Sequence, residues 1–529
     1  MKKNDIYNIL NKLILIFLVA QPLLDIYMAV VGEVWDLFGI SAATIIRTFF
    51  VISMFIVVII TQIRYKHKTK YICVVLGYIS IVLLYSLAHH INIVGFDGYF
   101  IAEGIYNSLT ELLYVLRLII PVLLMYIIII TKPARNNLLK TVMIVAATIS
   151  IVIVTTNLFK ISFASYSQTG ETIQYNIVDW FTKEDLTYKY TLSKGYFVSA
   201  NQIGALLVFL LPMVIYYTLR ENKWYLYLIL LLQIISMVLV GTRVANYGWI
   251  LVSIAMVTMY TILHFTKRYK LKLQPMIILT VILIIGAVLY ANSPSHSRAF
   301  ASEYEGMYNE DQLELDGAKY IPIEDFKEIL SDEEKTLKYL GKASNNLIND
   351  AKTKYISEMY KYHYITNKYI LEIYPYTDDL DFWLNIFEQP ISVKGDNRGR
   401  QVAIIKRIKE NNDNLFLDTL LGMGATPLNA RGYMIENDLI SHYYNLGIIG
   451  TLLFVVPYIF GIVYAMYKSR KYIFGITNME FAVYVLAIVM TYFVGYFAGH
   501  VIDEYIISIY LGVISGGVFN FYKGGRVNG

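Results

Sequence analysis

The sequence has little charge and almost no cysteine. Only 16% of its 529 residues are Asp, Glu, Lys or Arg, whereas about a quarter is usual in a soluble protein. Cys73 is the single cysteine, so the chain can form no intramolecular disulfide and offers no cysteine-based metal site. A Walker A loop, an HExxH pair and a GxSxG elbow are also absent, so nothing points to the phosphate-loop, zinc-protease or serine-hydrolase chemistry of those motifs.

Long apolar segments dominate instead. Hydrophobic residues make up 57% of the chain, in runs long enough to cross about 30 Å of hydrocarbon as helix. Short alternating segments, which are typical of a membrane β-barrel, are not seen. The composition therefore predicts an all-α polytopic membrane protein. The first apolar run contains Asp25 and no small-residue cleavage site, so we expect no cleaved signal.

We expect about twelve transmembrane helices with one large loop before the tenth. The loop, residues 293–437, divides the chain into spans 1–9 in residues 1–292, the loop domain, and spans 10–12 in residues 438–529. Apolar residues at helical spacing predict that the loop is mainly helical. The expected spans are residues 9–31, 41–63, 71–91, 109–131, 138–159, 197–219, 224–241, 246–265, 274–292, 439–467, 480–499 and 504–522.

Basic residues occupy alternate connections between these spans. Arg64–Lys70, Lys132–Lys140, Arg220–Lys223 and Lys267–Lys272 all fall on the side of the N-terminus, and the short connections on the other side hold few. Cytoplasmic loops of membrane proteins carry an excess of Lys and Arg. The pattern predicts a multi-pass protein of the cell membrane with both termini cytoplasmic and residues 293–437 extracytoplasmic.

Charges inside or at the edge of a span need a reason, because they are costly in hydrocarbon. Asp25, Arg47, Glu111 and Arg117 are in such places. One interpretation is buried pairing, for example of Asp25 with Arg47. The other is an arginine that faces an anionic ligand in a cavity.

Several arginines are candidates for binding an anion. Arg243 lies at the expected outer end of the seventh span, where an arginine runs against the charge bias. Its planar set of donors suits phosphate oxygens, although an interfacial arginine can also contact only lipid headgroups. Arg398 and Arg400 begin an expected loop helix, and Arg431 lies in a glycine-rich stretch. Because the loop is net acidic, anion binding there must come from such local arginines.

Glu436, Asp438 and His442 lie at the start of the tenth span. Asp438 and His442 are four residues apart and share a helix face, whereas Glu436 and Asp438 point apart. A carboxylate or imidazole beside a sugar hydroxyl can act as general base, and helix capping is the alternative. Asp379 and Asp381 form a DxD pair, a spacing common by chance, and we assign no metal site.

Three stretches resemble the O-antigen ligase and polymerase superfamily. They are GTRVANYG at 241–248, NRGRQVAIIKRI at 397–408 leading to LLGMG, and ENDLISHYYNLGIIGTLLFV at 436–455. The span count and the loop before the tenth span are also similar. The resemblance implies a GT-C-like, metal-independent, inverting glycosyltransferase without cofactor. Its members transfer a glycan from an undecaprenyl-diphosphate carrier on the outer face of the cytoplasmic membrane.

The resemblance also implies roles for individual residues. Arg243 and Arg400 are the first candidates for binding the diphosphate, followed by Arg431, Arg298 and Arg398. Family members often carry a His-Asn pair about eleven residues before a GxxG, which here is Gly447 to Gly450. The matching position is Glu436, followed by Asn437. We therefore expect Glu436 to act as the base, with Asp438 or His442 as alternatives.

The expected partners are an undecaprenyl-diphosphate-linked glycan donor, a glycan acceptor and membrane lipid. A flippase and a chain-length regulator are further candidates, and nucleic acid is not expected. A capsule or exopolysaccharide polymerase is the first hypothesis. A ligase that attaches a finished polysaccharide to a lipid or wall acceptor is the second. A polysaccharide flippase or transporter is the rival from another class, but carriers usually show two related halves, and no such likeness is evident.

Overall fold

The computed structural model describes the chain as two compact helical units. The first, here the membrane unit, comprises Met1–Ser86, Leu112–Ala299 and Thr451–Gly529, and the second, the loop unit, comprises Leu87–Glu111 and Phe300–Gly450. The division at 293–437 stays a prediction. The described residues are 2–31, 36–37, 40–94, 108–167, 170–184, 186, 190–266, 272–296, 320–363, 365–394, 396–412, 415–425, 435–468 and 479–521.

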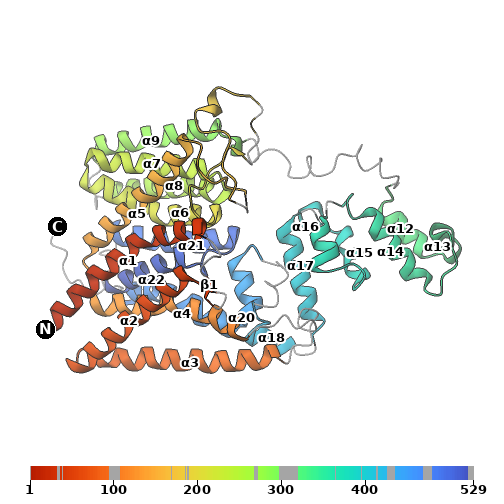
Figure 1. The fold of residues 1–529 in the computed structure, drawn as a ribbon, viewed down its shortest axis with the longest axis horizontal. Coiled ribbons are helices and arrows are strands. Elements are labelled where there is room, and N and C mark those ends of the chain that lie inside the picture. The colour runs from red at the N-terminus through yellow and green to blue at the C-terminus, as the bar shows by residue number, and fades with distance from the viewer. Residues whose placement is uncertain are drawn as a thin grey trace. The chain divides into compact units, whose positions relative to one another are not determined.

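Within the described residues, twelve apolar helices lie where the apolar runs predict them (Figure 1), so the all-α polytopic fold class is confirmed. Ten of the described helices are long and apolar enough to cross a membrane. They are α1 (Lys3–Val31), α2 (Ala42–Arg64), α3 (Thr69–Val94), α4 (Ser108–Thr131), α5 (Arg135–Leu158), α6 (Ala200–Glu221), α8 (Arg243–Phe265), α9 (Leu273–Ala291), α20 (Asp438–Lys468) and α21 (Met479–Ala498). The other two, α7 (Trp224–Val240) and α22 (Tyr505–Phe521), have 17 residues each.

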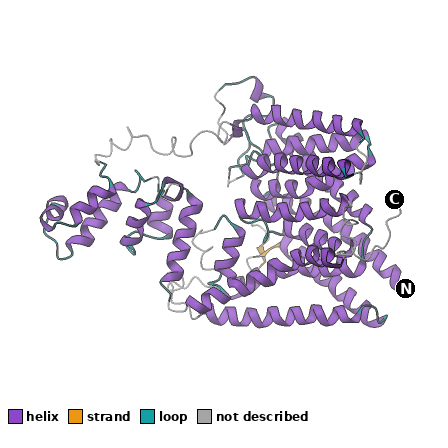
Figure 2. Cartoon of the chain, turned by 180° about the vertical axis from the view of Figure 1, so that it is seen from behind, coloured by secondary structure: helices purple, strands orange, loops and turns teal. Residues whose placement is uncertain are grey.

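Strands contribute little to the described chain, as Figure 2 shows. β1 (Asp36–Leu37) and β2 (Ile40–Ser41) pair antiparallel, with Leu37 opposite Ile40. They lead directly into α2, whose first turn is capped by Ser41. The Ser41 hydroxyl accepts a hydrogen bond from the Thr44 amide at 3.3 Å, which satisfies one of the free N–H groups at the helix start.

Helix α6 forms the interior of the membrane unit. It is buried along almost its whole length and packs against α7, α8 and α21. Small residues allow the close approach of α8, as is common between membrane helices. A Cβ added at Gly248 would come within 2.2 Å of Val208 Cγ2 on α6.

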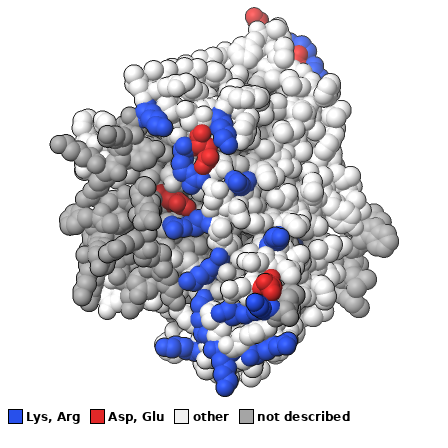
Figure 3. Space-filling view, turned by 90° about the vertical axis from the view of Figure 1, so that its left-hand side faces the viewer, with Lys and Arg blue, Asp and Glu red and all other residues white. Residues whose placement is uncertain are grey.

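The end of α4 contacts both α1 and the connection between α2 and α3 at one end of the membrane unit. Asn11 donates to the Thr131 carbonyl at 3.2 Å, and the Lys68 ammonium donates to the Ile130 carbonyl at 3.0 Å. Figure 3 shows this face, where Lys and Arg gather with few acidic residues. The basic connections Arg64–Lys70, Lys132–Lys140 and Arg220–Lys223 therefore share one end, while their cytoplasmic location stays a prediction. Most of Lys267–Lys272 lies outside the described residues.

The charges within spans are partly paired inside the membrane unit. Arg117 forms an ion pair with Glu504. Arg47 instead donates to the Gln21 amide oxygen at 2.8 Å, and Asp25 accepts a hydrogen bond from the Val198 amide at 3.1 Å. The pair of Arg117 and Glu504 is partly exposed, with 31% and 25% of the two side chains accessible, so it is not a buried pair. The hydrogen-bond partner of Arg47 is a neutral amide rather than Asp25.

The loop unit has a hydrophobic core of its own, built on short amphipathic helices. Phe326 and Tyr355 stack in it with ring centroids 3.9 Å apart, and Trp383 is fully buried. The prediction that this segment is mainly helical is confirmed for its described part. Its elements are α12 (Ile323–Leu330), α13 (Glu333–Leu340), α14 (Leu347–Met359), the π-helix η4 (Lys368–Ile373), α15 (Leu380–Glu388), α16 (Ile391–Lys394), α17 (Asn397–Glu410) and α18 (Leu415–Leu421).

The two acids of the DxD pair have separate partners in the loop unit. Asp379 caps α15 by accepting a hydrogen bond from the Phe382 amide at 3.0 Å, and it pairs with Arg407 at 2.7 Å. Burial raises the pKa of this carboxyl, but the bonds from Arg407, Phe382 and Tyr374 outweigh burial and bring the pKa below its usual value. Asp381 is exposed and pairs with Lys352.

His363 is a buried titratable group in the loop unit. Its side chain is 2% exposed, and its ring stacks on Phe387 with centroids 4.3 Å apart. Burial, reinforced by the charge of Lys394, lowers the pKa of the imidazole to about 3. The unfolded chain has a histidine pKa of about 6.5. As the pH falls below that value, the unfolded chain takes up a proton that the folded chain does not.

We therefore predict that the loop unit loses stability as the pH falls from about 6.5 towards 3, by on the order of 1 kcal/mol per pH unit. The His363→Phe variant keeps the stacking and removes the proton site, so its stability should depend less on pH. Thermal unfolding followed by tryptophan fluorescence at about pH 7.5 and about pH 5 measures both. Parallel losses in the variant and the unchanged protein would contradict this assignment.

Candidate functional site

Helix α20 is interrupted at Gly447. This residue has φ 67° and ψ −176°, whereas the residues on either side are helical. In a continuous helix, the carbonyls of Tyr444 and Asn445 would accept hydrogen bonds from the amides four residues later. The break leaves these two carbonyls without their helical donors, and a left-handed φ of this kind is favourable only for glycine.

A glycine-rich turn after α18 supplies the missing donors. The Met423 amide donates to the Tyr444 carbonyl and the Gly424 amide to the Asn445 carbonyl, each at 2.9 Å. The contact is too close for side chains: a Cβ at Gly422 would lie 2.3 Å from the Asn445 oxygen, and one at Gly447 would lie 2.4 Å from the Leu420 oxygen. Gly422 of LLGMG and Gly447 of the GxxG stretch therefore lie at the same close contact between the turn and α20.

The three candidate bases differ in exposure. Asp438 is 2% exposed and His442 is 1% exposed; they lie four residues apart in α20, as predicted. The helix cap is neither of the acids but Asn437, whose side-chain oxygen accepts a hydrogen bond from the Ile440 amide at 3.0 Å. Glu436, just before the cap, is half-buried, with 44% of its side chain exposed. Of the three, Glu436 is the one that reaches solvent.

The first turn of α17 holds Glu436 in place. Arg398 Nε lies 3.2 Å from Glu436 Oε2, and the Arg398 side chain is also half-buried. The Glu436 amide donates to Gln401 Oε1 at 2.9 Å, and Gln401 Nε2 donates to the Tyr369 hydroxyl at 3.0 Å. Arg398 and Gln401 are three residues apart, so they project from the same face of α17. The carboxylate is thus fixed by both its backbone and its side chain.

The predicted diphosphate arginines occupy different environments. Arg400 is 1% exposed, donates to the Lys394 carbonyl and the Asn397 side chain, and lies over the Tyr369 ring at 5.2 Å. Arg243 is exposed at the first position of α8 in the membrane unit, after Thr242, whose hydroxyl caps the helix. Arg298 and Arg431 lie outside the described residues. The loop unit therefore contains Arg398, Arg400 and the three candidate bases, and of these residues Arg398 contacts Glu436.

Gln401 and Tyr369 were not singled out from the sequence. Gln401 sits three residues after Arg398 in α17, which was a usable signal for a shared face. Tyr369 gave no signal, because it is one of 47 tyrosines. Within the described ranges, no group of three or more His, Cys, Asp or Glu side chains is arranged to hold a metal ion.

We predict that Gly447→Ala destabilises the protein more than a left-handed φ alone would. Gly341, with φ 74° and open space around it, is the matched control, because Gly341→Ala adds only the conformational cost of about 1–2 kcal/mol. Gly77→Ala, in the middle of α3 with nothing nearby, should not destabilise the protein, because alanine is favoured over glycine in a helix interior by about 0.5–1 kcal/mol. Size-exclusion chromatography of heated, detergent-solubilised protein measures the folded fraction. If Gly447→Ala were no worse than Gly341→Ala, the close approach to Leu420 would not be required.

Comparison with known protein families gives a match that covers nearly the whole chain. The model of the family described as O-antigen ligase like membrane protein matches residues 7–521. No curated protein matches the chain. The match includes the apolar helices, α17 and the segment from Glu436 to Gly450. Members of this family are multi-pass membrane enzymes of surface polysaccharide assembly, which transfer a glycan from a lipid-linked donor to a glycan acceptor. The chain belongs to the O-antigen ligase like family of membrane proteins.

Proposed function

We propose that this protein polymerises undecaprenyl-diphosphate-linked oligosaccharide units on the outer face of the cytoplasmic membrane. The observation that carries the proposal is the pair of Glu436 and Arg398. The Glu436 carboxylate, just before α20, and the Arg398 guanidinium, in the first turn of α17, lie 3.2 Å apart, and both are half-exposed. General-base catalysis requires a carboxylate that is held firmly and can still be reached by the hydroxyl of an incoming sugar.

The proposed reaction is a single displacement at the anomeric carbon of the donor glycan. The acceptor hydroxyl oxygen forms the new bond while the bond from that carbon to the diphosphate oxygen breaks. Glu436 takes the hydroxyl proton, and the carrier leaves as the free polyprenyl diphosphate. The anomeric configuration inverts. No metal ion or cofactor is part of this scheme.

The leaving diphosphate gains negative charge as its bond breaks, and positioned guanidinium groups stabilise that charge. Arg398 is half-exposed beside Glu436 and suits this role. Arg243, which is exposed in the membrane unit, stays a candidate from the sequence. Arg400 is buried, so its guanidinium would first have to leave Lys394 and Asn397. Arg298 and Arg431 stay candidates from the sequence. Asp438 and His442 are buried and are second to Glu436 as the base.

A ligase is the second candidate, because the family description itself names a ligase. It would use the same displacement with a different acceptor, a lipid or wall component in place of another lipid-linked unit. Purified protein in detergent, supplied only with a lipid-linked repeat unit, separates the candidates. Longer glycans with released carrier diphosphate support a polymerase. Transfer only after a second acceptor is added supports a ligase, and unchanged substrate supports a transporter.

In this assay we predict that Glu436→Gln lowers the rate about 100-fold or more, as expected for loss of a general base, and that Arg398→Ala lowers it less. Lys406 and Glu410 provide matched controls, since they form an exposed pair on the same helix at 3.7 Å. Lys406→Ala and Glu410→Gln should leave the rate unchanged. Wild-type product length and rate in Glu436→Gln would remove Glu436 from the mechanism.

The proposed orientation places both termini in the cytoplasm and residues 293–437 outside. A Cys73→Ser background removes the only cysteine. Ser357 in the loop unit and Lys223 before α7 are both exposed and can each be replaced by cysteine. We predict that a membrane-impermeant maleimide labels Ser357→Cys in intact cells and labels Lys223→Cys only after permeabilisation. The opposite result would invert the topology and remove the outer-face site.

A further inference from the structure

The buried face of helix α3 changes from apolar to polar in its last turns. Its buried stripe is apolar at Val75 and Val82 and becomes polar at His89 and Asn92, which are 1% and 8% exposed. These two residues are three positions apart and share a helix face. Glu111, in the first turn of α4, is also buried at 3% exposed. Polar groups in such places are costly unless each finds a partner, so their contacts show what they hold.

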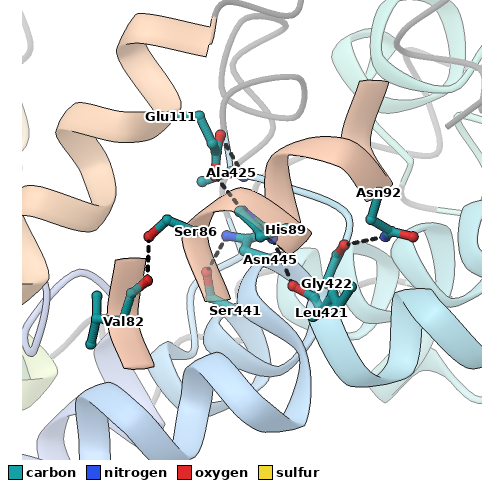
Figure 4. Close-up of polar contacts among 10 residues, drawn as sticks. All are labelled: Val82, Ser86, His89, Asn92, Glu111, Leu421, Gly422, Ala425, Ser441 and Asn445. Carbon is teal, nitrogen blue, oxygen red and sulfur yellow. Dashed lines mark hydrogen bonds and ion pairs between the residues drawn. The ribbon is translucent and has the colours of Figure 1, made fainter. Parts of the chain in front are cut away.

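The contacts converge on the glycine-rich turn, as Figure 4 shows. His89 Nδ1 lies 2.7 Å from the Leu421 carbonyl, and His89 Nε2 lies 3.1 Å from Glu111 Oε1. The Ala425 amide donates to both carboxylate oxygens of Glu111, at 3.1 and 3.2 Å. His89 and Glu111 thus hydrogen-bond to the two ends of Leu421–Ala425.

Asn92 adds a third attachment to the same segment. Its side-chain amide donates to the Gly422 carbonyl at 3.0 Å and to Asp418 Oδ1 at 2.9 Å (Figure 4 shows the first of these contacts). Asp418 is 1% exposed and lies in α18, immediately before the turn. The turn is therefore fixed from one side by α3 and α4, and from the other by its own bonds to the Tyr444 and Asn445 carbonyls.

The contacts of His89 also require hydrogens at defined positions. A carbonyl oxygen only accepts, so His89 Nδ1 must carry a hydrogen. A bare imidazole nitrogen and a carboxylate oxygen are both acceptors, and their 3.1 Å contact is a hydrogen bond only if one proton lies between them. A direct catalytic role is not supported, because both side chains are almost fully buried.

We propose that His89 and Glu111 are positioning residues: they clamp the Gly422–Ala425 turn onto the break in α20 and so fix the helical piece at 438–446. That piece begins directly after Glu436 and its neighbour Asn437. The clamp itself follows from the contacts alone. Its consequence for glycan transfer rests on the proposed function, in which a displaced Glu436 would no longer meet the acceptor hydroxyl.

The test compares three substitutions of Glu111. Glu111→Gln keeps the size of the side chain: its oxygen can accept from the Ala425 amide, and its NH₂ can donate to His89 Nε2. Glu111→Asp keeps the charge but is one methylene too short, and Glu111→Ala removes the group. Glu324→Ala, at an exposed glutamate of the same unit, is the matched control.

Hydrogen exchange of the full-length protein in lipid nanodiscs measures the clamp without any substrate. In Glu111→Ala, the amides of Met423–Ala425 should exchange about 10- to 100-fold faster, which corresponds to a lost charge-assisted hydrogen bond. Glu111→Asp should be intermediate, and Glu111→Gln and Glu324→Ala should match the unchanged protein. The amides of Tyr355–Met359 in α14 serve as an internal reference for folding.

The same variants are then assayed for transfer with the lipid-linked repeat unit. Glu111→Ala should lower kcat about 10- to 100-fold with little change in KM, since misplacement by about 1 Å can cost that much, and Glu111→Gln should retain activity. If Glu111→Gln loses protection or activity while Glu111→Asp keeps both, charge rather than the hydrogen-bonded clamp is what matters, and the proposal is overturned. Unchanged exchange in Glu111→Ala also overturns it, whereas an inactive unchanged protein with the expected exchange pattern counts only against the proposed function. Should Glu111→Ala fail to fold, Glu111→Gln and Glu111→Asp decide alone.

Discussion

A backbone carbonyl that loses its helical donor in a buried segment must find another, because an unpaired polar group there is costly. In this protein the break at Gly447 creates two such carbonyls, and the turn at Gly422–Ala425 satisfies both. This exchange of donors joins α18 to the first part of α20. The candidate site depends on this connection, since Glu436 and the helix cap Asn437 come directly before that part of α20.

The same requirement explains the polar residues at the end of α3. An apolar helix can end in His89 and Asn92 without penalty only if backbone and carboxylate groups meet them, and the turn provides these groups. The turn in turn needs glycine, because side chains at Gly422 and Gly447 would collide with main-chain oxygens. Glycines and buried polar residues far apart in sequence are thus parts of one arrangement, in which each compensates for the cost of the other.

The charged residues of α17 differ in their surroundings, although they are close together in the sequence. Arg398 and Glu436 remain half-exposed as a pair, and an exposed pair of this kind adds little stability, typically under about 1 kcal/mol. The pair matters because it fixes the orientation of the Glu436 carboxylate. Arg400, two residues along the same helix, is directed inward onto Tyr369 and the Lys394 carbonyl. Neighbouring arginines on one helix therefore serve different purposes, one at the surface and one in the interior.

The sequence by itself determined the apolar helices, because the drive of a long apolar run to leave water depends on that run alone. It also determined that the loop is helical and that Asp438 and His442 lie four residues apart on a helix, since these are matters of local spacing. Only the tertiary structure decided which candidate base reaches solvent, that Arg398 meets Glu436, that Arg400 is buried, and that His89 grips Leu421. Burial and pairing of this kind arise from the packing of segments distant in the chain, and no local pattern of residues encodes which segments will meet.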